Sequence, residues 1–235
     1  MSRLLLVRHA QASFFAADYD QLSDLGLEQA HVLGRHWSRH GPQPDALVTG
    51  PRRRQHQTAR AVAEHLPTGL ELWELPEFDE VRLDVIISST WEPSRSVPPE
   101  LSSLVTRYRE AQEPSARMRA FQQLAMAVAD AWLHGHYVVP EAETWTEFAI
   151  RVRRGLDQLR GRVGRGKTVA VFTSAGPVAA LLQHALHCPN PTALELVWQV
   201  YNASISELLF TQDRLTLRHF NQVAHLAEPR LLTYR

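Results

Sequence analysis

The amino-acid sequence predicts an α/β protein with a mostly parallel sheet flanked by helices and a helical insertion. Short apolar segments lack polar alternation, as strands buried on both faces do. Segments with helical apolar spacing alternate with them, which favours parallel strands joined by helices. The 235 residues are 44% hydrophobic and 21% charged, as in ordinary globular proteins. This length favours a single domain, residues 1–235, with the insertion at about 80–140.

The beginning of the chain alternates strictly between strand and helix patterns. Ser23 stands at the N-cap position of a helix that is expected to end near Gly41 and Pro42. A second helix is expected from about Arg53 to His65. The strands expected between these helices cover residues 3–8, 45–49 and 70–73.

The middle of the chain departs from this alternation, which resumes after it. A loop rich in Ser and Pro is expected around 90–99, and a helical pattern, broken near Pro114, runs over 101–133. We interpret this part as a helical cap inserted into the domain. The elements expected after it are a helix at about 143–163, a buried strand at 168–173, a helix at 177–186 and a terminal antiparallel hairpin over 201–210 and 214–220.

Charge, hydropathy and cysteine content exclude several classes of protein. Lys+Arg and Asp+Glu both number 25, so no overall basic field attracts nucleic acid. No apolar stretch approaches the ~20 residues of a membrane span, and the N-terminus lacks the features of a signal peptide. The single cysteine, Cys188, excludes an internal disulfide and a Cys-rich metal site. We expect a cytoplasmic protein without nucleic-acid or membrane partners, and we predict no oligomeric state.

Three strand ends carry residues that suit an anion. Arg8 and His9 follow the first strand, the segment TGPRRRQHQTA (49–59) follows the second, and TSAGPV (173–178) follows the buried strand late in the chain. Ligands of open α/β sheets bind outside the carboxyl ends of the strands, and helix N-termini attract anions. Each segment alone also has a structural explanation, as a strand end, an exposed helix start or a strand-to-helix turn. Their combination favours a phosphate site.

These segments resemble the histidine phosphatase superfamily, whose fold is that of the phosphoglycerate mutases. The family's opening Arg-His-Gly motif appears as Arg8-His9-Ala10, and its helix motif appears as LSDLGLEQA at 22–30. Its second phosphate-binding arginine, four residues before a Thr-Ala pair, falls on Arg54. The resemblance extends from Arg3 to about Phe220 and is weak through the middle.

The resemblance implies covalent phosphoryl transfer without a metal or another cofactor. His9 is expected to attack phosphorus and form a phosphohistidine that water then hydrolyses. Arg8 and Arg54 are expected to bind the phosphoryl oxygens and to disfavour protonation of His9. The family's proton donor follows the third strand, where the pattern L-x-E-x-D falls on residues 75–79. It indicates Glu77 as the general acid, with Glu80 as the alternative.

The sequence departs from the family at one position. Most members have a second histidine in a His-Gly-Gly turn, and this chain has Ser174 in its place. A hydroxyl can donate a hydrogen bond to a phosphoryl oxygen but brings no positive charge, so a weaker site is expected. Asn202 matches an asparagine of the family and is interpreted as a supporting residue.

Three functions are compatible with these residues. The survival of the nucleophile, both arginines and a candidate acid favours a phosphomonoesterase that acts on a small phosphorylated molecule, with weak activity. An impaired phosphate-binding module is the alternative. A phosphoglycerate mutase is disfavoured, because it must protect its phosphohistidine from water in a well-formed pocket.

Overall fold

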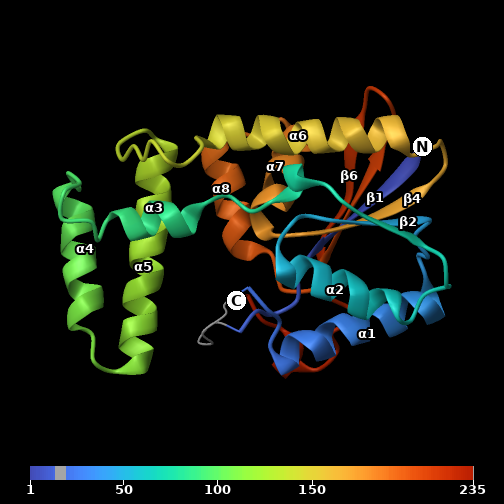
Figure 1. The fold of residues 1–235 in the computed structure, drawn as a ribbon, viewed down its shortest axis with the longest axis horizontal. Coiled ribbons are helices and arrows are strands. Elements are labelled where there is room, and N and C mark those ends of the chain that lie inside the picture. Colours follow the sequence, from blue (N-terminus) through green and yellow to red (C-terminus); the bar gives the residue numbers. More distant parts are fainter. Residues whose placement is uncertain (14–19, 235) are drawn as a thin grey trace. The chain divides into compact units, whose positions relative to one another are not determined.

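The computed structural model describes residues 1–13 and 20–234, and it confirms the predicted α/β class. Six strands form one sheet in the order β3-β2-β4-β1-β5-β6 (Figure 1). The strands are β1 (Ser2–Arg8), β2 (Ala46–Thr49), β3 (Glu71–Glu74), β4 (Thr168–Thr173), β5 (Ile205–Phe210) and β6 (Leu215–Gln222).

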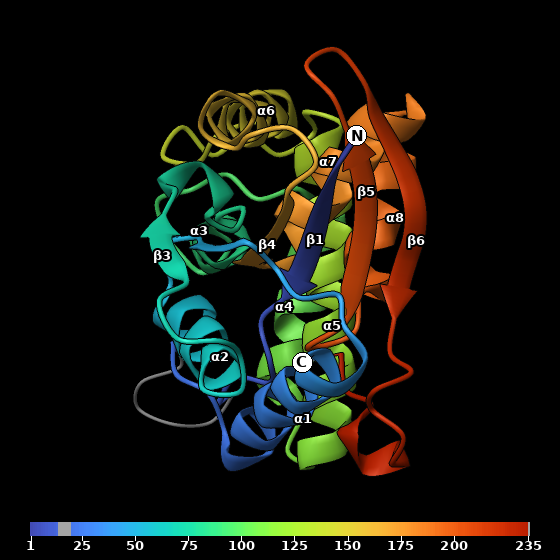
Figure 2. The ribbon, with the colours of Figure 1, turned by 90° about the vertical axis from the view of Figure 1, so that its right-hand side faces the viewer.

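The sheet is mostly parallel, as expected. β3, β2, β4 and β1 pair in parallel, whereas β5 pairs with β1 and β6 with β5 in antiparallel orientation. Figure 2 shows β1 between β4 and β5, with β6 outside β5. The register pairs Arg8 with Thr173 on β4, and Thr49 with Phe172. The carboxyl ends of β1, β4 and β2 therefore lie side by side at one edge of the sheet.

Helices cover both faces of this sheet. Leu5 and Val7 of β1 belong to a buried cluster with residues of α1 and α2, and the alternate residues Leu4 and Leu6 face the opposite side. α7 packs against β1 and β6. The helices beside the sheet are α1 (Asp24–His40), α2 (Arg53–Ala63), α6 (Trp145–Arg162), α7 (Ala175–Leu186) and α8 (Asn190–Gln199).

Both ends of α1 form as the sequence predicts. The Ser23 hydroxyl accepts a hydrogen bond of 3.0 Å from the Gly26 amide, which satisfies a free donor of the first turn. Gly41 ends the helix with φ of 65°, a conformation that glycine adopts without steric cost. The α1 helix is thereby fixed where Gln29 can donate to the Leu231 carbonyl at 2.9 Å, and this bond holds the C-terminal segment.

The chain divides into two compact units, residues 1–80 with 149–235, and residues 81–148. The second unit contains α3 (Leu83–Ser89), α4 (Pro99–Glu110) and α5 (Pro114–Leu133), and α4 lies beside α5 (Figure 1). Within it, the Trp132 and Trp145 rings meet edge to face at 6.3 Å, and the Ser89 and Tyr137 hydroxyls are 2.7 Å apart. The helical pattern over 101–133 is thus two helices, interrupted before Pro114.

Three local predictions differ from the structure. Two of the differences are the helices α3 and α8, which the sequence analysis does not predict. The strand expected over 201–210 begins only at Ile205, because residues 201–204 turn away from the sheet, with Ala203 at φ of 55°. No helix in the described part of the chain is long and apolar enough to cross a bilayer.

Candidate active site

His9 lies directly after β1, and only 6% of its surface is exposed. Its Nδ1 lies 2.8 Å from the Ala10 carbonyl oxygen, which can only accept, so Nδ1 carries the proton. The remaining ring nitrogen, Nε2, accepts a hydrogen bond of 3.1 Å from Arg54 Nε. Both contacts define the same tautomer, in which Nε2 holds the lone pair that a nucleophile needs.

The surroundings of His9 keep its ring neutral. Burial is the main cause, and the positive charges of Arg54 and Arg8 add to it, so the pKa of His9 lies well below its usual range. An uncharged imidazole at neutral pH is the form that attacks an electrophile. The lowered pKa and the hydrogen bonds of His9 therefore both indicate a neutral ring with an unprotonated Nε2.

The two predicted arginines come from different elements. Arg8 ends β1, and its Nη1 donates to the carbonyl oxygen of Val200. Arg54 is the second residue of α2 and is 6% exposed. Its Nη1 donates to Asp20 Oδ1 at 2.9 Å, while Asp20 Oδ2 accepts from the Arg53 amide at 3.0 Å. Asp20 thus holds both the guanidinium and the first turn of α2.

Ser174 lies at the end of β4, beside the nucleophile. The His9 amide donates to the Thr173 carbonyl oxygen at 2.7 Å, which places the residues after β1 and β4 next to each other. Ser174 is completely buried, and its hydroxyl accepts a hydrogen bond of 2.8 Å from Gln55 Nε2. Gln55 follows Arg54 on α2, so the second and third strand ends also meet at this point.

The two candidate carboxylates point to different places. Glu77 Oε1 accepts a hydrogen bond of 2.7 Å from Gln158 of α6, and the Glu77 Cβ lies close to Gly155 of the same helix. The Glu80 carboxylate instead accepts from the Gly176 amide, at 3.1 and 3.4 Å. Gly176 is two residues beyond Ser174. These contacts link Glu80, and not Glu77, to the residues around His9.

Asn202 supports the nucleophile, as interpreted from the sequence. Its Nδ2 donates to the His9 carbonyl oxygen at 3.1 Å, and its Oδ1 accepts from the Thr233 hydroxyl at 2.9 Å. Thr58 donates to the Arg54 carbonyl at 2.7 Å and accepts from the Ala10 amide at 3.1 Å. The loop that carries His9 is therefore held from two sides.

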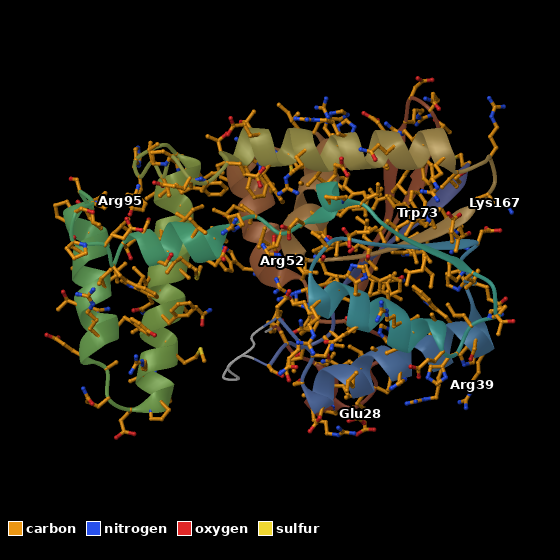
Figure 3. The ribbon with its side chains drawn as sticks, viewed as in Figure 1. Glu28, Arg39, Arg52, Trp73, Arg95 and Lys167 are labelled. Carbon is orange, nitrogen blue, oxygen red and sulfur yellow. The ribbon has the colours of Figure 1, made fainter. Side chains whose placement is uncertain are left out.

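Sequence reasoning missed Gln55 and Asp20. Gln55 is the third residue of α2, a position where a glutamine often bonds the N-cap amide. The predicted start of this helix could therefore have indicated that Gln55 has a structural role. Asp20 gave no signal, because it contacts Arg54 only through the folding of a loop. Among the other arginines of the TGPRRRQHQTA segment, Arg53 is exposed and Arg52, labelled at the start of α2 in Figure 3, forms an ion pair with Asp79.

The assembled groups are suited to nucleophilic displacement at phosphorus. A neutral imidazole with a directed lone pair lies against the Arg54 guanidinium. Arg8 ends β1, Ser174 follows β4, and the Glu80 carboxylate is bound to the Gly176 amide beyond Ser174. Guanidinium groups match the geometry of phosphoryl oxygens and stabilise their charge. The carboxylate can give a proton to a leaving oxygen.

Comparisons with known proteins agree with this chemistry. The model of the histidine phosphatase superfamily, branch 1, matches residues 4–137 and 117–223. YhfR of Bacillus stearothermophilus has the same fold, with a TM-score of 0.67 and 16% identity over 96% of this chain and 100% of that one. A mycobacterial glucosyl-3-phosphoglycerate phosphatase, solved with inorganic phosphate, superposes with a TM-score of 0.61 and 23% identity over 95% and 98%.

A putative alpha-ribazole-5'-P phosphatase from Escherichia coli is also similar, with a TM-score of 0.62 and 22% identity over 94% of this chain and 96% of that one. These identities are low, so the solved structures establish the fold and not the substrate. No curated protein matches the sequence significantly.

Proposed function

Because the chain belongs to branch 1 of the histidine phosphatase superfamily, we propose that it hydrolyses a small phosphomonoester through a phosphohistidine on His9. The hydrogen bond from Arg54 Nε to His9 Nε2 carries this proposal. It aims the unprotonated ring nitrogen at the guanidinium that would hold the phosphoryl group. The positive charge of the arginines makes a metal or cofactor unnecessary for the proposed reaction.

In the first step, the Nε2 lone pair of His9 attacks phosphorus. An N–P bond forms while the P–O bond to the leaving group breaks. Arg54 Nε leaves His9 and donates to a phosphoryl oxygen, and Arg8 donates to another, so that both guanidinium groups stabilise charge in the transition state. The Ser174 hydroxyl donates a third, neutral hydrogen bond.

We propose Glu80 as the proton donor in place of Glu77, which the sequence pattern favours. The contact of Glu80 with the Gly176 amide supports this choice, since that amide belongs to the turn after Ser174. Glu80 protonates the leaving oxygen in the first step. In the second step it takes a proton from water, which attacks phosphorus, releases inorganic phosphate and restores His9.

We expect the turnover to be low. The buried hydroxyl of Ser174 replaces the charged donor that most of the family is expected to have, and a charge-assisted hydrogen bond is about twice as strong as a neutral one. Residues 81–148 are proposed to be an insertion into a single cytoplasmic domain that takes neither nucleic acid nor membrane as partner.

Hydrolysis of an aryl phosphate by the purified protein tests this function. We expect phosphate release by the wild type and none by His9→Ala, because the nucleophile is lost. The matched control is His136→Ala, which changes an exposed histidine of the other unit and is expected to keep full activity. A wild type that binds phosphate but hydrolyses no phosphomonoester would favour the binding module instead.

A further inference from the structure

A side-chain pair joins α2 to the end of β4. Gln55 and Ser174 are both fully buried, and Gln55 Nε2 lies 2.8 Å from Ser174 Oγ. Gln55 follows Arg54, whose Nε contacts His9. Adjacent residues of one helix thus reach the nucleophile and the serine on the neighbouring strand end.

The direction of the Gln55–Ser174 hydrogen bond is fixed by a third group. The Arg52 amide lies 3.0 Å from Gln55 Oε1. A main-chain amide can only donate, so the carbonyl oxygen of the Gln55 side chain must face Arg52. The amide nitrogen of Gln55 therefore faces Ser174 and donates to it.

As a result, the Ser174 hydroxyl is an acceptor toward Gln55 and keeps its own proton for another group. Ser174 is the N-cap of α7, where a serine usually accepts from an amide of the first turn. Here Ser174 accepts no such bond, and the Gly176 amide donates to the Glu80 carboxylate instead. Across the described residues, the hydroxyl has Gln55 as its hydrogen-bond partner and makes no further contact with an acceptor.

The residue that carries this hydroxyl stands beside the end of β1, where Arg8 and His9 lie. Thr173, the preceding residue, is paired with Arg8, and its carbonyl oxygen accepts from the His9 amide. A buried hydroxyl with an unused proton costs stability unless a ligand accepts from it. A phosphoryl oxygen bound to Arg8 and Arg54 is such an acceptor.

We propose that Gln55 is a positioning residue that orients the Ser174 hydroxyl as a hydrogen-bond donor to the transferred phosphoryl group. This inference rests on the proposed function. Gln55 itself does not touch the substrate. It occupies one lone pair of Ser174 Oγ and thereby directs the O–H bond away from α2. Two neutral side chains then supply one oriented donor at the end of β4.

The test is a double-mutant cycle with Gln55→Glu and Ser174→Ala. The glutamate has the size of glutamine and keeps an oxygen for the Arg52 amide, but its second oxygen cannot donate. The Ser174 hydroxyl must then donate to this carboxylate and turn away from the phosphoryl group. The kcat/KM for an aryl phosphate and the Kd for vanadate are measured for all four proteins, with Tm as the check of folding.

We expect Gln55→Glu to lower kcat/KM at least about tenfold more when Ser174 is present than in the Ser174→Ala protein, in line with a lost donor in a preorganised site. The added negative charge repels the substrate in both proteins and cancels in the ratio. Vanadate affinity should show the same dependence on Ser174. Should Gln55→Glu not fold, Gln55→Met replaces it in the same cycle.

Equal losses with and without Ser174 would overturn the inference, because Gln55 would then act independently of the hydroxyl. A wild type without turnover would contradict the proposed function instead. In that case, the vanadate measurements still decide whether Gln55 acts through Ser174. The two failures are therefore distinguishable.

Discussion

At the scale of single residues, the positions of Glu77 and Glu80 lead to opposite expectations for two similar substitutions. Glu80→Gln keeps an oxygen for the Gly176 amide but removes the ionisable proton. It should therefore slow hydrolysis of an alkyl phosphate far more than that of an aryl phosphate, because a strongly basic leaving oxygen needs protonation most. We expect a difference of about 10²-fold for the alkyl ester. Glu77→Gln serves as the matched control and should leave both rates nearly unchanged.

Kinetic measurement of these two variants on both esters checks the assignment. A selective loss on the alkyl ester in Glu77→Gln, with Glu80→Gln unaffected, would return the role to the residue that the sequence pattern indicates. Thermal unfolding of both variants separates this effect from a loss of the contact between Glu80 and α7.

The titration of His9 is a second prediction at this scale. Burial and the two guanidinium groups lower the pKa of His9, so the folded protein binds this proton only at a pH well below the 6.5 of an ordinary histidine. NMR spectra of ring-labelled histidine should show that His9 takes up its proton at a lower pH than an ordinary histidine. Arg54→Met removes one positive charge and should raise this pKa. A His9 resonance that titrates near 6.5 in the wild type would contradict the arrangement.

Residue identity could be predicted from sequence only where a motif specifies it. His9, Arg8 and Arg54 could be predicted because they stand at fixed distances from strand ends and from a Thr-Ala pair. The contacts of Gln55 with Ser174, and of Glu80 with Gly176, join segments about a hundred residues apart. Nothing in the local sequence determines such contacts, and the choice between Glu77 and Glu80 depended on one of them.

At the scale of elements, the packing of α1 against the loop after β1 depends on a glycine. A Cβ at position 26 would lie 2.1 Å from the main-chain oxygen of Gln11, so the helix or the loop would have to move. Gly26→Ala should lower the free energy of unfolding by about 1–3 kcal/mol, as overpacking does. In α6, a Cβ at Gly161 meets nothing within 4 Å. Gly161→Ala should cause no loss and should gain up to about 1 kcal/mol from helix propensity.

Urea denaturation of the two alanine variants measures both free energies. Equal stability of Gly26→Ala and the wild type would show that α1 does not approach this loop closely. Because Gln11 and Gln29 join the same loop to α1, Gly26→Ala should also lower phosphatase activity.

Elements with a strong apolar period were predicted well, and those that depend on tertiary contacts were not. β4 has the predicted bounds, and the N-cap of α1 is the predicted Ser23. The strand was expected to include residues 201–204, yet this part of the chain leaves the sheet and brings Asn202 to the His9 carbonyl. α3 has only seven residues, too few for a helical period to stand out. α8 has a proline in its first turn and apolar residues at 193, 194 and 197, a helical signal that was overlooked.

At the scale of the whole molecule, the buried side chain of His225 makes the free energy of unfolding depend on pH. Burial, together with the nearby His36, lowers the pKa of His225 to about 4, although a hydrogen bond to the Ala203 carbonyl opposes the shift. The unfolded chain binds this proton near pH 6.5 and the folded chain near pH 4. The contribution of His225 to the free energy of unfolding is therefore fully present above pH 6.5. It falls by about 3 kcal/mol as the pH is lowered toward about 4.

Free energies of unfolding between pH 4 and 7.5 test this dependence. His225→Gln should reduce the slope, and His9 accounts for part of what remains, because its pKa is shifted in the same direction. His219→Gln, a change at an exposed position, should leave the slope as in the wild type. An unchanged slope in His225→Gln would contradict the burial of this ring.

If the phosphoryl group passes through His9, a phosphorylated form of the protein exists during turnover and can be trapped. The protein is mixed with a phosphomonoester labelled at phosphorus, quenched at alkaline pH, where the N–P bond survives, and digested for mass spectrometry. We expect a phosphohistidine at His9 in the wild type, a larger trapped amount in Glu80→Gln when a good leaving group is used, and none in His9→Ala. Release of phosphate without any label on His9, or label on another residue, would contradict it.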